Sequence, residues 1–203
     1  MNLIESIHSE YVEERRIRCL TCHLSEVLPK CVSVLDVGCG SGQLARTISQ
    51  ERRDLSFTGI DVLLREKTWM PVRTFDGRNI PFESASIDVV MFVDVLHHAD
   101  DPMTLLREAT RVAKKCVLIK DHLLEGVLAG PTLRFMDHIG NARYGVSLPG
   151  NYWCRRDWER AFVANGMKPV EWRERLRLYP PLLDWFFGRS LHFVTKLDVG
   201  HTP

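Results

Sequence analysis

Short apolar runs alternate along the chain with segments in which apolar residues recur every three or four positions. Continuous apolar runs are typical of strands buried on both faces, and the wider spacing is typical of amphipathic helices. Helical spacing occurs at 3–28, 44–48, 102–112 and 155–165. Strands are predicted at 32–37, 55–61, 72–75, 87–95, 117–120, 168–177 and 190–197. This alternation predicts one α/β domain with a mostly parallel sheet.

Two segments interrupt the alternation. Residues 62–70 are a short connection, with room for a reduced helix at most. Residues 122–153 hold five glycines and two prolines, which predict a loop-rich insert. We therefore expect a single domain over 1–203, with an N-terminal helical region at 1–29 and an insert that reaches over the strand ends.

The stretch VLDVGCGSG at 34–42 ends a buried strand and places three glycines at alternate positions. Glycine lets a backbone approach a ligand closely and adopt positive φ, and the next helix presents unpaired N–H groups. The first strand-to-helix turn of such a sheet lies where ligands bind. The spacing departs from the dinucleotide fingerprint GxGxxG, because residue 43 is glutamine. The loop is interpreted as a site for a nucleotide-like ligand.

Acidic residues mark the same edge of the predicted sheet. Asp36 lies within the first strand, and Asp61, Asp76 and Asp94 end or follow later strands. The carboxylate of Asp61 can accept hydrogen bonds from two ribose hydroxyls, and that of Asp76 from an exocyclic amine. No Lys or Arg occurs between residues 31 and 45, which argues against a phosphate-binding loop of the GxxxxGK[ST] kind.

Composition narrows the class of protein further. Hydrophobic residues make up 45% of the 203 residues and charged residues 26%, with a net charge of +1. This balance predicts a globular protein without a dedicated nucleic-acid or membrane surface. The charged N-terminus is unlike a secretory signal, and six scattered cysteines fit a reducing compartment, so a cytoplasmic location is expected.

Four motifs together resemble the class I S-adenosylmethionine-dependent methyltransferases of the small-molecule, type 11-like kind. They are VLDVGCGSG at 34–42, GID at 59–61, DGRNIPFESASIDVV at 76–90, and DVLHHADDP at 94–102 followed by RVAKK. The resemblance covers residues 30–120 well. It implies a Rossmann-like three-layer sandwich whose seven-stranded, mostly parallel sheet has an antiparallel last strand. It also implies methyl transfer from S-adenosylmethionine to an oxygen, nitrogen or carbon of a small-molecule acceptor.

The resemblance also implies cofactor contacts, residue by residue. The main chain of Gly38, Cys39 and Gly40 would support the methionine and ribose portions, and Asp36 would face the amino group. Asp61 would bind the ribose hydroxyls. Further contacts would come from Asp76 and Gly77 at the adenine and from Asp94 and Val95 at the methionine end.

A hydroxyl or carbon acceptor also needs a base near neutral pKa, which is usually histidine. We expect His98 or His138 in this role. The other candidates after the fourth and fifth strands and in the insert are Asp121, His122, Asp137, Tyr144 and Tyr152. The insert at 122–153 would cap the acceptor pocket.

Several alternatives stay open from the sequence. The chain could bind S-adenosylmethionine without catalysis, as a partner or regulator. Gln43 argues against a nicotinamide-dependent reductase, and the segment DVLH at 94–97 lacks the motif of base-amine methyltransferases. Asp94 and Asp121 could hold Mg²⁺, but no metal is expected, because the residues after the fifth strand do not match that arrangement and no zinc-ligand spacing occurs. The oligomeric state and the acceptor's identity do not follow from the sequence.

Overall fold

A computed structural model describes residues 3–141 and 149–200 of the chain. The strands are β1 (Ser33–Val37), β2 (Ser56–Asp61), β3 (Val72–Thr74), β4 (Ile87–Val93), β5 (Ala113–His122), β6 (Lys168–Glu174) and β7 (His192–Asp198). The helices are α1 (Leu3–Val27), α2 (Gln43–Glu51), α3 (Pro102–Val112), α4 (Ala129–Asn141), α5 (Arg155–Ala164) and α6 (Pro181–Leu183). Two short helical turns, η1 (Leu96–His98) and η2 (Asp184–Gly188), complete the elements.

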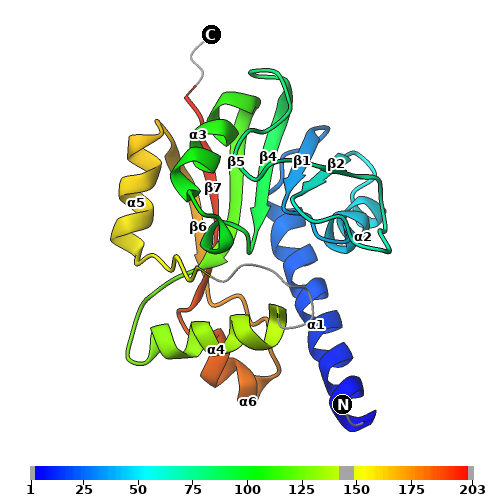
Figure 1. The fold of residues 1–203 in the computed structure, drawn as a ribbon, viewed down its shortest axis with the longest axis vertical. Coiled ribbons are helices and arrows are strands. Elements are labelled where there is room, and N and C mark those ends of the chain that lie inside the picture. The colour runs from blue at the N-terminus through cyan, green and yellow to red at the C-terminus, as the bar shows by residue number, and fades with distance from the viewer. Residues whose placement is uncertain (1–2, 142–148, 201–203) are drawn as a thin grey trace.

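The seven strands form one sheet in the order β3-β2-β1-β4-β5-β7-β6. Strands β1 to β5 pair in parallel, and β7 is antiparallel to both of its neighbours, β5 and β6. Figure 1 shows α3 and α5 on one side of the sheet and α1 and α2 on the other. The predicted three-layer, mostly parallel fold with an antiparallel last strand is therefore confirmed.

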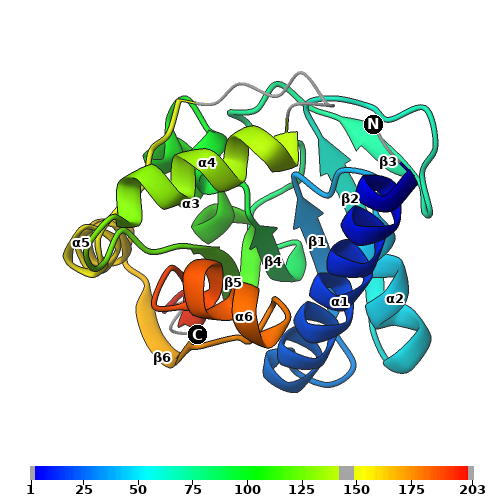
Figure 2. The ribbon, with the colours of Figure 1, turned by 90° about the horizontal axis from the view of Figure 1, so that it is seen from below.

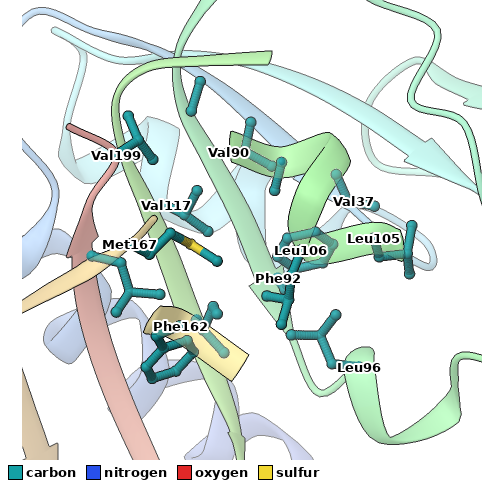
Figure 3. Close-up of a cluster of buried hydrophobic side chains, with 14 of the residues drawn as sticks. Val37, Val90, Phe92, Leu96, Leu105, Leu106, Val117, Phe162, Met167 and Val199 are labelled. Atoms are coloured by element: carbon teal, nitrogen blue, oxygen red, sulfur yellow. The ribbon is translucent and has the colours of Figure 1, made fainter. Parts of the chain in front are cut away.

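The central strands are continuously apolar because both of their faces are buried. Alternate residues of β4 point to opposite sides, so Val90 and Phe92 face α3 and α5 while Val89 and Met91 face α1 and α2. Leu105 and Leu106 of α3 pack on the first face, together with Phe162 of α5 (Figure 3). The helix α3 begins as predicted, with Pro102 in its first turn and the Asp101 side chain accepting a hydrogen bond from Thr104 N at 3.0 Å. This core fixes the carboxyl end of β4, where the candidate site begins.

Two segments differ from the sequence-based expectation. The insert at 122–153 is not loop-rich throughout, because the thirteen-residue helix α4 lies within it. Pro131 is tolerated because it lies in the first turn of α4, and Leu133 anchors the helix by packing with Ala129 and Leu191. The connection at 62–71 contains no helix, although a reduced one had room there.

The helices α4 and α6 lie beyond the carboxyl ends of β4 and β5, where they cover one end of the sheet (Figure 1). The view from below shows α1 beside this end as well (Figure 2). The strand β5 runs further than predicted, to His122, so it carries three polar side chains, Lys120, Asp121 and His122, into this region. Among the described residues, no helix has the length and apolar character needed to cross a membrane.

Candidate active site

The glycine loop after β1 requires glycine at position 38. Gly38 has φ +74°, and its N–H donates to the carbonyl oxygen of Ile60 at 2.8 Å. A Cβ at this position would lie 2.5 Å from Cγ2 of Val95, so the loop after β1 and the loop after β4 meet here without space for a side chain. Gly40 differs, because it has φ +57° but no atom lies within 4 Å of its would-be Cβ. The surface over Gly40 is therefore open to a ligand.

Asp61 joins the end of β2 to this loop. Its Oδ2 accepts a hydrogen bond from Gly40 N at 2.7 Å, and its Oδ1 accepts one from Leu63 N at 2.9 Å. The residue is buried. Each carboxylate oxygen can accept a further hydrogen bond, so Asp61 retains acceptor capacity toward a ligand.

Asp36 is buried in β1 beside Asp61, and no described residue forms an ion pair or hydrogen bond with its carboxyl group. Burial, together with the negative charge of Asp61, raises the pKa of Asp36 from 3.8 to about 7. Burial and the same two acids raise the pKa of the Cys39 thiol, which therefore stays protonated. No cation among the described residues pairs with Asp36, so a positively charged ligand would be favoured beside it.

Asp76 and Gly77 form a turn after β3. The Oδ1 atom of Asp76 accepts hydrogen bonds from the backbone N–H of Arg78 at 2.8 Å and of Asn79 at 2.7 Å. These bonds, with that from the Asn79 side chain, lower the Asp76 pKa. Gly77 has φ +77°, which suits glycine in this turn. The structure thus gives Asp76 a local role in the turn.

Asp94 follows β4 with φ +55° and is compensated by two cations. Its carboxylate accepts from Arg16 of α1 and from Lys120 of β5, whose side chain is 1% exposed. Burial alone would raise the Asp94 pKa, but Lys120 and Arg16 hold it well below 3.8. Neither Lys120 nor Arg16 is among the residues predicted at this edge from the sequence.

A cluster of imidazoles and carboxylates lies beside Asp94. His97 is buried in η1, with its Nδ1 2.5 Å from Asp121 Oδ1 and its Nε2 3.5 Å from Asp137 Oδ2. Burial would lower the His97 pKa, but Asp121 and Asp137 raise it to about 10. His122 Nε2 lies 3.4 Å from Asp137 Oδ1, and Tyr152 donates its hydroxyl hydrogen to Asp137.

The two histidines predicted as bases are placed very differently. His98 is partly buried, and its ring centroid lies 3.9 Å from that of His97. Burial and the positive charge of His97 lower the His98 pKa to about 4, so its imidazole is neutral at pH 7. His138 is exposed on α4, whereas its neighbour Asp137 points inward. The structure brings His98 to the cluster and leaves His138 outside it, while Tyr144 lies outside the described residues.

The sequence reasoning missed three residues that build this site: Arg16, Lys120 and His97. Arg16 is distant in the chain, and no local pattern links it to Asp94. A lysine at the end of the apolar run CVLIK was a usable signal, because a lysine is rarely fully buried unless it is paired. Its neighbour His98, and not His97, is a candidate from the sequence.

Comparisons with known proteins identify a methyltransferase domain in part of the chain. A family model described as a methyltransferase domain matches residues 35–118. The 27-O-demethylrifamycin SV methyltransferase of Amycolatopsis mediterranei (strain S699) is 29% identical over 132 residues, which are 54% of this chain and 48% of that protein. The chain spans about half the length of the curated relatives it matches.

Solved structures share the fold over most of the chain. One is a chain of the complex between the Haloferax volcanii Trm112 methyltransferase activator and a putative methyltransferase. It has a TM-score of 0.67 and 16% identity, covering 97% of this chain and 94% of that one. An S-adenosylmethionine-dependent methyltransferase from Mesorhizobium loti also has a TM-score of 0.67, with 14% identity, covering 89% of this chain and 97% of that one. The chain therefore matches the methyltransferase domain over residues 35–118 and has the fold of S-adenosylmethionine-dependent methyltransferases such as the Mesorhizobium loti protein, which implies S-adenosylmethionine as its cofactor.

Proposed function

We propose that this protein transfers a methyl group from S-adenosylmethionine to a small-molecule acceptor. The observation that carries the proposal is the pair of buried carboxyl groups, Asp36 and Asp61, beside an open glycine loop. A ligand with an ammonium and a sulfonium would compensate their negative charge, whereas a phosphate would be repelled. The curated relative from Amycolatopsis is named for a small-molecule substrate, which supports the acceptor class.

The cofactor contacts are proposed from the same loop. The main chain of Gly38, Cys39 and Gly40 would support the methionine and ribose portions, and the free acceptor positions of Asp61 would take the ribose hydroxyls. The carboxyl group of Asp36, which has no partner among the described residues, would face the amino group.

We propose that the adenine and methionine ends of the cofactor bind at the loops that follow β3 and β4. Asp76 and Gly77 would lie at the adenine, and Asp94 and Val95 at the methionine. Asp94 forms ion pairs with Arg16 and Lys120, which fix its carboxylate and compensate its negative charge. It would therefore attract the positively charged cofactor less strongly than Asp36 would.

Bound S-adenosylmethionine supplies a methyl group on positively charged sulfur, which leaves readily. The protein's part is therefore to orient the acceptor and exclude water. A cavity of about 360 Å³, lined by Arg15, Arg177, Tyr179, Pro181 and Asp184, lies between α1 and α6. We propose it as the entrance for a polar acceptor, because Arg15 precedes the Arg16 that binds Asp94.

His98 is the proposed base for an acceptor that must lose a proton. Its lowered pKa makes it a weaker base than an ordinary imidazole, but the ring is neutral and able to accept a proton at pH 7, and it lies in the turn that follows Asp94 and Val95. With a pKa of about 4, it would lose activity as pH falls through that value, because the protonated ring cannot accept a proton. A His98→Gln variant is expected to lower kcat by about 10²–10⁴-fold and to lose this acid limb in a pH–rate profile. His138→Gln should leave both unchanged, since His138 is exposed outside the cluster.

The function itself is tested with methyl-labelled S-adenosylmethionine and a panel of small phenols, amines and carbon acids, with mass spectrometry of the products. Transfer of label to one acceptor class supports the proposal. Tight cofactor binding without label transfer to any acceptor, including nucleic acid and protein, would instead support a cofactor-binding protein without catalysis. Label transfer to nucleic acid alone would contradict the small-molecule assignment.

A further inference from the structure

We propose that the protein binds one divalent transition-metal ion between η1, the end of β5 and α4. The ligands would be His97 through Nε2, the Asp137 carboxylate, and a neighbouring imidazole. Within the described residues, ligand atoms of His97, His98 and Asp137 all lie within 4.8 Å of one another. The proposal goes beyond methyl transfer, and because a metal-bound His98 could not act as the proposed base, the ligand besides His97 and Asp137 would be His122, whose Nε2 lies 3.4 Å from Asp137 Oδ1.

The distances around Asp137 fit ligands of a shared ion better than hydrogen bonds. His97 Nε2 lies 3.5 Å from one carboxylate oxygen and His122 Nε2 lies 3.4 Å from the other. Both separations exceed the usual N–H···O range of about 2.7–3.2 Å. Two donors bound tetrahedrally at about 2.0–2.1 Å from a metal are about 3.3 Å apart.

His97 directs at this position a ring nitrogen that is ion-paired with Asp137 at 3.5 Å but is not hydrogen-bonded to a described residue. Its side chain is 1% exposed, and its Nε2 has no hydrogen-bond partner among the described residues. A buried imidazole nitrogen without a partner is costly unless something else satisfies it. A metal ion between His97 and Asp137 would do so by displacing the proton that gives His97 its positive charge.

The surrounding groups fix these side chains as outer partners of metal ligands do. Asp121 lies 2.5 Å from His97 Nδ1, so the other ring nitrogen, Nε2, is the one that faces Asp137. Asp121 is itself held by Leu96 N, which donates to its Oδ2 at 3.0 Å. Tyr152 donates to Asp137 and orients its carboxylate. A carboxylate behind a histidine is the usual support of a metal-bound imidazole.

The donor set selects the class of ion. Imidazole nitrogens with one carboxylate suit Zn²⁺, Fe²⁺, Co²⁺ or Mn²⁺, whereas Ca²⁺ and Mg²⁺ prefer oxygen ligands. Asp94 also lies near His97 and His122. Its ion pairs with Arg16 and Lys120 place two cations on that side, which disfavours a metal there. The ion is therefore assigned to the side that faces α4.

The test uses untagged protein freed of metal with a chelator. We expect Co²⁺ to bind with a stoichiometry of one, followed by its d–d absorption, and Zn²⁺ to displace it in calorimetry. His97→Gln and Asp137→Asn should each weaken binding by at least about tenfold, as loss of a ligand or its support does. His138→Ala is the matched control, because His138 is exposed on the same helix next to Asp137 and should bind as wild type does.

Absence of stoichiometric Co²⁺ binding would overturn the proposal. So would binding that both variants retain and His138→Ala loses, which would indicate a surface site, or preferential binding of Mg²⁺. Thermal unfolding of each variant checks that it folds. Binding of S-adenosylhomocysteine to the same variants is measured in parallel. If the metal proposal is wrong and the cofactor proposal is right, the protein binds S-adenosylhomocysteine but no stoichiometric metal.

Discussion

The carboxyl group of Asp36 lies inside the fold beside a second acid, with no cation among the described residues to compensate it. Its pKa of about 7 lies above the ordinary 3.8, so the folded protein holds this proton more tightly than the unfolded chain. The contribution of the protonated Asp36 to the free energy of unfolding is therefore fully present below about pH 4, and it is lost as the pH rises through 7. An arrangement that costs stability at neutral pH is expected where a ligand supplies the missing positive charge.

Asp36→Asn tests this charge directly. At pH 8 the variant should have a higher free energy of unfolding than wild type, because it removes an uncompensated buried anion, and at pH 4 the two should be nearly equal. Urea unfolding at both pH values measures the difference. Asp100→Asn, at an exposed position, is the control and should show no such pH dependence. Equal effects of Asp36→Asn at the two pH values would contradict the assigned pKa.

The glycines of the loop give a second prediction. Gly38→Ala places a Cβ 2.5 Å from Val95 at φ +74°, so both a clash and backbone strain are expected. Gly40→Ala meets open space at φ +57° and should cost only the strain, about 1–2 kcal/mol. Thermal unfolding should therefore rank Gly38→Ala well below Gly40→Ala. The reverse order would show that the two loops do not meet as described.

At this scale the sequence identifies the residues and not their partners. Asp61 and the glycines follow from local spacing, because each lies at a strand end that periodicity predicts. The ion pairs of Asp94 with Arg16 and Lys120 join residues 78 and 26 positions apart, and no local pattern encodes such contacts. His97 and His98 are neighbours of the same type, and only burial distinguishes the imidazole beside Asp121 from the more accessible one.

At the scale of elements, periodicity predicts the sheet well and the insert poorly. The strands are predicted because burial on both faces makes runs such as IDVVMFV continuously apolar. The helix α4 is missed because Gly130 and Pro131 suggest a loop, although both lie in its first turn. Its inward face is marked by residues four positions apart, Ala129, Leu133 and Asp137, and the last of them is polar.

The docking of α4 can be tested with a matched pair of leucine-sized residues. Leu133 is 0% exposed against Ala129 and Leu191, whereas Ile139 is 59% exposed on the same helix. Leu133→Ala should speed amide hydrogen exchange across α4, with a loss of about 2–5 kcal/mol in local stability. Ile139→Ala should leave exchange close to that of wild type. Equal exchange in the two variants would show that α4 is not held through Leu133.

The contact between β4, β5 and α1 at Asp94 gives a second element-scale prediction. Lys120→Met leaves a buried carboxylate with one cation fewer and should lower the free energy of unfolding by about 3–5 kcal/mol. Adding Asp94→Asn removes the carboxylate that Lys120 no longer pairs with, so the double variant should lose less than the sum of the single losses, by about 0.5–3 kcal/mol. Strict additivity in denaturant unfolding would argue against the buried pair.

At the scale of the molecule, the strand order places every part of the candidate site at one edge. The order of connection reverses between β1 and β4, and the crevice at such a reversal is where α/β sheets bind ligands. The glycine loop and Asp61 lie on one side of this point, and Asp94 and the histidine cluster lie on the other. Helix α1, from the start of the chain, and α4, from the insert, complete it. The sequence predicts a mostly parallel sheet, and the resemblance implies its antiparallel last strand, but neither gives the strand order or shows which distant segments close over the crevice.

The central claim is that the open glycine loop binds S-adenosylmethionine. The most direct test is calorimetric titration of the purified protein with S-adenosylhomocysteine, with NADH and NADPH as controls. One-site binding of S-adenosylhomocysteine alone is predicted. Asp61→Ala should weaken it by about 10–100-fold, through loss of charge-assisted hydrogen bonds of about 1.5–3 kcal/mol, while Asp100→Ala should bind normally. Absence of binding, binding of a nicotinamide instead, or wild-type affinity in Asp61→Ala would contradict the account.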